Sequence, residues 1–237
     1  MKATEATEGG GELFDRFDTS YEEALARGVS ATGEDAEFYL QERVAWFGKA
    51  LAARGVSATR VLDFGCGTGN GAQFLLTLPG AREVVGIDVS DGLLARARAE
   101  HGSRQVHFEN VATHNADGTY DVAYCNGVFH HIPPAERAGA VAVVHASLKS
   151  GGLFAFWENN PWNPGTRYVM SRIEFDRDAI TLSPPDARRL LTSGGFDILG
   201  TTSRFFFPHV LRMFRTAEPL LSSIPLGGQY QVLCRKR

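Results

Sequence analysis

The sequence predicts an α/β fold built on a doubly wound, mostly parallel sheet. From residue 60 onward, short apolar segments alternate with stretches of helical character, as expected for repeated βαβ units. The first apolar segment runs directly into a glycine-rich loop, and such loops lie where ligands bind at the carboxyl ends of parallel strands. The 237 residues are enough for one domain of this kind with a small additional cap.

The N-terminal region precedes this pattern. Residues 1–11 are polar and acidic and lack the apolar segment of a signal peptide, so we expect a disordered tail. Residues 12–56 are expected to form an N-terminal helical cap, because apolar side chains recur there at helical spacing among charged ones. These side chains are Phe38, Trp46, Phe47 and Leu51. Residues 57–237 then form the main domain.

The elements of the main domain follow in order. Strands are expected at residues 60–64, 83–88, 105–109, 120–125, 152–158, 196–207 and 230–236. Helices are expected between them, at residues 71–78, 92–101, 135–148 and 183–196. The connector 208–228 is longer than most connections in a compact domain, which indicates either a functional segment or a helix of its own.

Composition restricts the class of function. A net charge of −3 predicts no nucleic-acid surface, and no apolar run approaches the ~20 residues of a membrane helix. Cys66, Cys125 and Cys234 lack the number and spacing of a disulfide framework or a zinc site, which favours a reduced, cytoplasmic enzyme. His130 and His131 are adjacent, but no third ligand stands at a plausible spacing, so we expect no metal.

The glycine loop indicates the ligand. In VLDFGCGTGN (61–70) the glycines follow GxGxG spacing, and Asn70 stands where a dinucleotide fingerprint needs its third glycine. Asp63, two residues before the loop, would disfavour a pyrophosphate and favour a ligand with an ammonium group. Asp88 ends the second strand, where a carboxylate can accept hydrogen bonds from a ribose. A ribose and an ammonium group together indicate S-adenosylmethionine.

Several of these motifs resemble those of a known family. VLDFGCGTGN followed by VVGIDVS is similar to the first motifs of class I S-adenosylmethionine-dependent methyltransferases, and YDVAYCNGVFHHIPP and LKSGGLFAF resemble their fourth and fifth strand regions. FDTSYEEAL, ENNPWNP and PLGGQY resemble a bacterial subgroup that methylates small molecules. The resemblance implies a seven-stranded Rossmann-like sheet of order 3-2-1-4-5-7-6 with the last strand antiparallel.

The resemblance also implies the cofactor site, with S-adenosyl-L-homocysteine as the product. The expected cofactor-binding residues come from the strand ends and from the N-terminal helical cap. They are Asp63, Gly65, Cys66, Gly67, Gly69, Asp88, Val89, Asn110, Val111, Cys125, Asn126 and Arg43.

The segment WENNPWNPG (157–165) follows the fifth strand, beside the expected position of the sulfonium methyl group. Because indoles and carboxamides are costly to bury without partners, we expect it to line the acceptor pocket. The alternative is a surface turn whose tryptophans cover the connector 208–228. The expected acceptor-binding residues are Tyr21, Asn159, Asn160, Trp162, Tyr168 and Arg172. The connector and the helical cap are expected to form a lid over the acceptor.

The expected reaction is methyl transfer to a small molecule, at a hydroxyl or ring nitrogen of an aromatic or heterocyclic secondary metabolite or a lipid-linked precursor. A hydroxyl acceptor must lose its proton, and the candidate bases are His131, Glu158 and His130, in that order. The alternatives are methylation of RNA or protein, or a protein that binds the cofactor without methylating. No nucleic-acid partner and no membrane insertion are expected, and a monomer and a homodimer are both consistent with the sequence.

Overall fold

A computed structural model describes residues 21–237, and the predicted tail with the first part of the predicted cap lies outside this range. Seven strands form one sheet in the order β3-β2-β1-β4-β5-β7-β6. Strand β7 is antiparallel to both of its neighbours, and the other pairs are parallel. The predicted strand order and the antiparallel last strand are therefore confirmed. The strands are β1 Arg60–Phe64, β2 Glu83–Asp88, β3 Val106–Asn110, β4 Tyr120–Asn126, β5 Leu148–Asn159, β6 Phe196–Arg204 and β7 Gln229–Lys236.

The helices follow the predicted alternation. Their bounds are α2 Tyr21–Val29, η1 Ser30–Thr32, α3 Ala36–Ala52, α4 Ala72–Leu75, α5 Asp91–His101, α6 Arg137–Ser147, α7 Pro164–Arg172, η2 Glu174–Asp176, α8 Pro184–Ser193, η3 His209–Ala217 and α9 Glu218–Leu221. Helix α7 was not expected. It begins with Pro164 in its first turn, and the side chain of Asn163 accepts a hydrogen bond from Thr166 N at 2.9 Å, which caps it.

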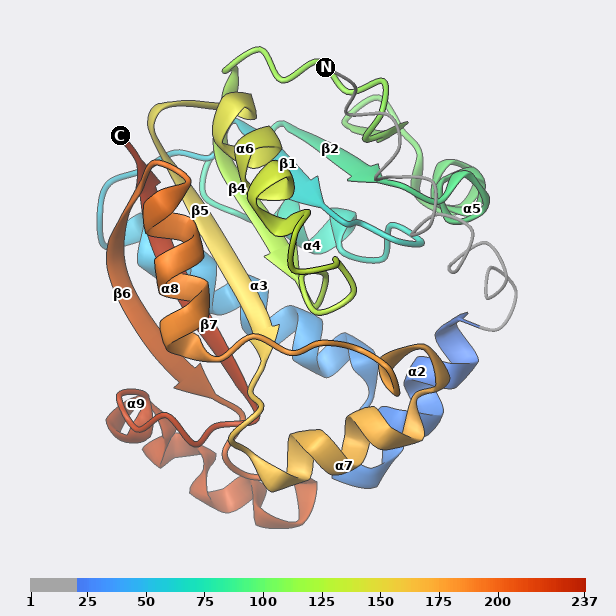
Figure 1. Ribbon diagram of the computed structural model, residues 1–237, viewed down its shortest axis with the longest axis vertical. Helices are drawn as coiled ribbons and strands as arrows, with labels where there is room; N and C mark the ends of the chain where they lie inside the picture. Colours follow the sequence, from blue (N-terminus) through green and yellow to red (C-terminus); the bar gives the residue numbers. More distant parts are fainter. Residues whose placement is uncertain (1–20) are drawn as a thin grey trace.

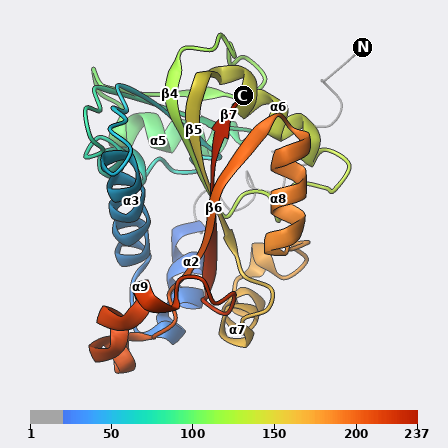
Figure 2. The ribbon, with the colours of Figure 1, turned by 90° about the vertical axis from the view of Figure 1, so that its left-hand side faces the viewer.

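Helices cover both faces of the sheet, as Figures 1 and 2 show. Helices α3, α4 and α5 bury their apolar side chains on one face, in a core that includes Phe47, Leu75 and Leu94. Helices α6 and α8 cover the other face, where Val144 and Leu191 meet Phe154 of β5. From Gly152 to Glu158 strand β5 is buried from both sides, which explains its apolar run LFAFW.

The strand order reverses between β1 and β4, and at such a point the carboxyl ends of parallel strands leave room for a ligand. Helices α2 and α7 contact each other beyond this end of the sheet (Figure 1). The connector 208–228 forms η3 and α9, which confirms that it has helical structure of its own. Within residues 21–237, no helix combines the length and the apolar character needed to cross a membrane.

Candidate active site

The loop after β1 is shaped by glycine. Gly65, Gly67 and Gly69 all have positive φ values, of 73°, 54° and 80°, which L side chains rarely adopt. A Cβ atom on Gly65 would lie 2.3 Å from Val128, and one on Gly69 would lie 2.6 Å from Phe108. A Cβ on Gly67 would meet nothing within 4 Å. The loop is therefore packed at both ends, and its middle borders open space where a ligand can approach the backbone.

Asp88 fixes this loop from the end of β2. Its Oδ2 accepts a hydrogen bond from Gly67 N at 2.8 Å, and its Oδ1 accepts one from Ser90 N at 3.1 Å. The carboxylate is buried, with 8% of the residue exposed. Two backbone amides thus orient it at the strand end where Rossmann-like folds bind a ribose.

Asp63 lies on the neighbouring strand. Burial raises the pKa of the Asp63 carboxyl to about 7, and the negative charge of Asp88 adds to the increase. The protein therefore stabilises the ionised carboxylate of Asp63 poorly unless a cation binds beside it. The ammonium group of an amino-acid cofactor would supply that cation.

Several other predicted cofactor residues lie along this edge of the sheet, in different surroundings. Asn110 donates from Nδ2 to Val89 O at 3.2 Å and to Asp91 Oδ1 at 2.9 Å, so it organises the loops after β2 and β3. Cys66 and Val111 lie half-buried along the same edge. Cys125 is fully buried in the core beneath α6 and α8, so its side chain does not face the cofactor as expected.

Asn126 tests whether the site fits S-adenosylmethionine. Its Oδ1 is buried and accepts no hydrogen bond from the described residues. Such an orphaned acceptor is costly unless a ligand satisfies it. The open space above Gly67 and the raised pKa of Asp63 agree with this, and all three features are compatible with a cofactor carrying an ammonium group and a ribose.

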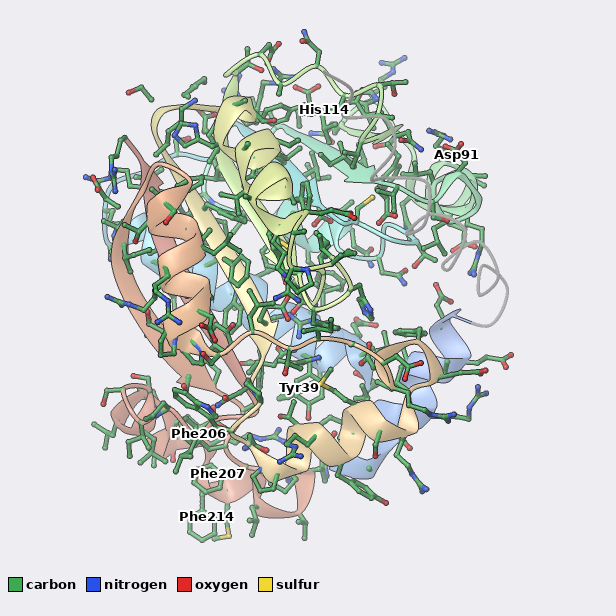
Figure 3. All side chains as sticks on the ribbon, viewed as in Figure 1. Tyr39, Asp91, His114, Phe206, Phe207 and Phe214 are labelled. Atoms are coloured by element: carbon green, nitrogen blue, oxygen red, sulfur yellow. The ribbon has the colours of Figure 1, made fainter. Side chains whose placement is uncertain are left out.

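A cavity of about 410 Å³ adjoins Asn126 and Gly127 at the tip of β4. Most of its wall is apolar and comes from α2, η1, α3, α7 and residues 205–208. Figure 3 places Tyr39 between α3 and α7, with Phe206 and Phe207 where the chain leaves β6. The polar lining is Arg43, Asn126, His130, His131, Asn159, Asn163, Asp176 and Gln229, together with Thr32 and Thr166.

Arg43 lies in this cavity wall. Its Nε donates to Tyr124 Oη at 3.1 Å and its Nη1 donates to Gln229 Oε1 at 2.9 Å, so both partners are neutral. The residue is only 7% exposed. Its buried positive charge can therefore attract an anionic group of a ligand.

Glu158 and His130 form a buried pair next to the cavity. Glu158 Oε2 lies 2.7 Å from His130 Nδ1, and its carboxylate also accepts hydrogen bonds from Phe129 N at 2.7 Å and Asn159 N at 3.3 Å. Burial alone would lower the pKa of His130, but Glu158 and Asp176 raise it to about 10. Glu158 is fully buried and does not line the cavity, so the structure does not place it as a base for the acceptor.

Asp176, from η2, joins the two histidines. Its Oδ1 lies 3.4 Å from His130 Nε2 and 3.1 Å from His131 Nε2. Burial opposes ionisation of Asp176, but hydrogen bonds from the two imidazoles lower its pKa to about 2, while burial lowers the pKa of His131. The expectation that no third metal-ligating group accompanies the histidines was wrong. The pairing spans 46 residues, and no local pattern in the sequence indicates it.

The segment WENNPWNPG has several roles. Asn159 and Asn163 line the cavity, as does Tyr168 further along α7. Asn160 is buried and donates from Nδ2 to Pro225 O at 3.1 Å and Gly227 O at 2.8 Å, so it anchors the turn before β7.

Three predicted acceptor residues do not line the cavity: the buried Asn160, Trp162, which is 45% exposed, and the exposed Arg172. The side chain of Tyr21 lies outside the described residues.

The cover of the cavity agrees with the predicted lid only in part, since α2 and η1 belong to the predicted helical cap. It comes from α2, η1, α7 and residues 205–208, whereas residues 209–227 of the connector do not line the cavity. Phe214 points away in Figure 3 and is 48% exposed. The connector contributes indirectly through Glu218, whose carboxylate accepts hydrogen bonds from the backbone amides of Phe205, Phe206 and Phe207.

A Rossmann-like sheet with an acidic strand end beside a glycine loop defines a class of α/β proteins that bind a nucleoside cofactor. The family model described as a methyltransferase domain matches residues 62–154. An uncharacterized methyltransferase of Synechocystis is 30% identical over 147 residues, which cover 59% of this chain and 68% of that protein. A trans-aconitate 2-methyltransferase of Methylobacterium nodulans is 29% identical over 131 residues, covering 55% of this chain and 47% of the enzyme.

Among solved structures, the fold is similar to a methyltransferase of Thermotoga maritima described as a possible histamine N-methyltransferase. The TM-score is 0.68 at 20% identity, covering 96% of this chain and all of that one. The chain belongs to the class I S-adenosylmethionine-dependent methyltransferases, whose cofactor is S-adenosylmethionine. The matches span 24%, 47% and 38% of the lengths of the first three curated relatives.

Proposed function

We propose that the chain transfers the methyl group of S-adenosylmethionine to a small molecule held in the 410 Å³ cavity. The observation that carries this proposal is the position of the cavity. It meets Asn126 and Gly127 at the tip of β4, next to the glycine loop, so donor and acceptor can be aligned across that boundary. Alignment of this kind can contribute roughly 7–11 kcal/mol to lowering a barrier.

The proposed cofactor site consists of the glycine loop, Asp63, Asp88 and Asn126, with the loops around Val89 and Asn110 beside the adenine. Gly67 and Asp88 would bind the methyl donor independently of whether the acceptor is bound. We propose that His131 and His130 face the reacting atom of the acceptor, since both lie in the polar part of the cavity wall. Glu158 then orients His130.

The cavity wall supports a particular kind of acceptor. Tyr39, Met170 and Phe206 provide apolar and aromatic contacts, whereas Arg43 provides a buried positive charge. We therefore propose an aromatic or apolar molecule that carries an anionic group, methylated at a hydroxyl oxygen. The relatives that methylate trans-aconitate, an anion, are consistent with an anionic group near Arg43.

A cavity-filling substitution tests the proposal. Val169 lines the cavity from α7, and Ser171 lies exposed on the same helix. With radiolabelled S-adenosylmethionine and a library of hydroxylated acids, we expect Val169→Trp to abolish transfer and to retain cofactor binding by calorimetry. Ser171→Trp is the matched control and should transfer as the wild type does. Equal transfer by both variants would show that the acceptor does not enter this cavity.

Methylation of RNA or protein, and cofactor binding without methylation, would each give a different result in the same assay. A macromolecular substrate would leave the label in RNA or protein and not in the small-molecule fraction. A protein that binds the cofactor without methylating would bind it in calorimetry and transfer no label to any fraction.

A further inference from the structure

Two histidines and an aspartate converge at the polar end of the cavity. His130 and His131 follow β4, and Asp176 comes from η2. One ligand atom of each residue lies within 4.8 Å of the other two. Asp176 Oδ1 is 3.4 Å from His130 Nε2 and 3.1 Å from His131 Nε2. Around a tetrahedral ion with bonds of about 2.0–2.2 Å, neighbouring ligand atoms are roughly 3.4 Å apart.

The carboxylate of Glu158 supplies a second, independent feature. It contacts His130 Nδ1 at 2.7 Å and is itself fixed by Phe129 N and Asn159 N. In metal sites, a carboxylate on the distal imidazole nitrogen directs the other nitrogen toward the ion. Here that other nitrogen, Nε2, is the one that faces Asp176. The side chain is therefore held in the orientation that coordination requires.

Charge and access also fit an ion. The carboxylates of Glu158 and Asp176 lie within 3.4 Å of the imidazole nitrogens, and a divalent cation would balance the negative charge of two such groups. His130, His131 and Asp176 all border the 410 Å³ cavity, so further coordination positions open toward the acceptor. Two nitrogens and one oxygen form a donor set that favours transition metals over magnesium or calcium.

We propose that His130, His131 and Asp176 bind a divalent transition-metal ion, zinc or one of similar preference, which holds the acceptor oxygen beside the methyl group. The hydroxyl proton leaves to solvent when the oxygen coordinates, because a bound cation lowers the pKa of its ligand. An oxygen lone pair then forms the bond to the methyl carbon. The carbon–sulfur bond breaks, and sulfur keeps the electron pair as S-adenosylhomocysteine forms.

Metal binding can be measured without cofactor or acceptor. The full chain is treated with a chelator, dialysed, and titrated with Co²⁺ alone by visible absorption and with Zn²⁺ alone by calorimetry. We expect one ion per chain. Asp176→Asn and His131→Gln should each weaken binding at least about tenfold, and Glu158→Gln about 10- to 100-fold. His107→Gln removes an exposed histidine on β3 and should bind as the wild type does.

Circular dichroism melting shows which variants are folded, and His131→Gln keeps the test valid if Asp176→Asn does not fold. Absence of cobalt binding by the wild type would overturn the proposal. So would wild-type affinity in the folded variants, or an equal loss of affinity in His107→Gln.

The role of the metal ion in methyl transfer rests on the proposed function and is measured separately. Methyl transfer should fall at least about tenfold after chelation and return with Zn²⁺ or Co²⁺. An unchanged rate in the metal-free protein would overturn this part. If instead the metal-loaded protein binds cobalt at the cluster but transfers no methyl group to any small molecule, the proposed function fails and the metal site stands.

Discussion

Replacement of Asp63 by asparagine should stabilise the protein without cofactor while weakening its binding of the cofactor. The folded state raises the pKa of Asp63 from 3.8 to about 7 and so prefers the protonated carboxyl. The destabilisation is absent below the unfolded pKa, grows as pH rises from about 4 to 7, and is complete above the folded pKa. At ~1.36 kcal/mol per pKa unit, a shift of about 3 units corresponds to an upper bound of about 4 kcal/mol at pH 8.

The test compares urea unfolding of the wild type and Asp63→Asn between pH 5 and 8, without cofactor. The difference in unfolding free energy should grow by about 2–3 kcal/mol in favour of the variant over this range. Asp197→Asn, at an exposed carboxylate on β6, is the control for the substitution itself. Calorimetry at pH 8 should show S-adenosylmethionine binding weakened at least about tenfold in Asp63→Asn, because the ammonium group loses its counter-charge. A difference in unfolding free energy that stays constant with pH would show that folding does not raise the pKa of Asp63.

Further substitutions separate the two halves of the site. Asp88→Ala should weaken S-adenosylmethionine binding at least about tenfold in calorimetry, because hydrogen bonds to a charged group contribute ~1.5–3 kcal/mol; unchanged affinity would remove Asp88 from the cofactor site. Trp162→Ala should change the acceptor KM less than about twofold, because Trp162 is exposed outside the cavity. Tyr168→Ala removes an aromatic side chain from the cavity wall and should raise the acceptor KM several-fold. A larger rise in acceptor KM for Trp162→Ala than for Tyr168→Ala would contradict this assignment of the cavity wall.

The sheet was predictable because each of its strands and its glycine loop is indicated by a short stretch of sequence. Each buried strand reads as a short apolar run, and the loop from Gly65 to Gly69 needs backbone angles that favour glycine. The spacing from Asp63 to Asp88 placed both acids at the same edge of the sheet. Helix α7 was less evident, because its polar first turn reads as a loop, although Asn163 and Pro164 are a typical helix start.

The acceptor site was only partly predictable, because its residues meet through tertiary structure. Asn159 was found from its place after β5, but the neighbouring Asn160 turns to the backbone before β7 instead. Asp176 reaches the histidines from a short helix far along the chain, and its sequence context is an ordinary acidic segment. The 45% exposure of Trp162 is likewise a property of the tertiary structure that no short-range pattern specifies.

A structure of the chain with bound S-adenosylhomocysteine would show directly whether the donor site and the cavity meet. We expect the ribose hydroxyls to bind Asp88 and the amino group to lie near Asp63. The sulfur should lie near Asn126 and face the cavity containing His131. If the ligand binds with its sulfur turned away from that cavity, or away from the glycine loop altogether, the proposed alignment of donor and acceptor is wrong.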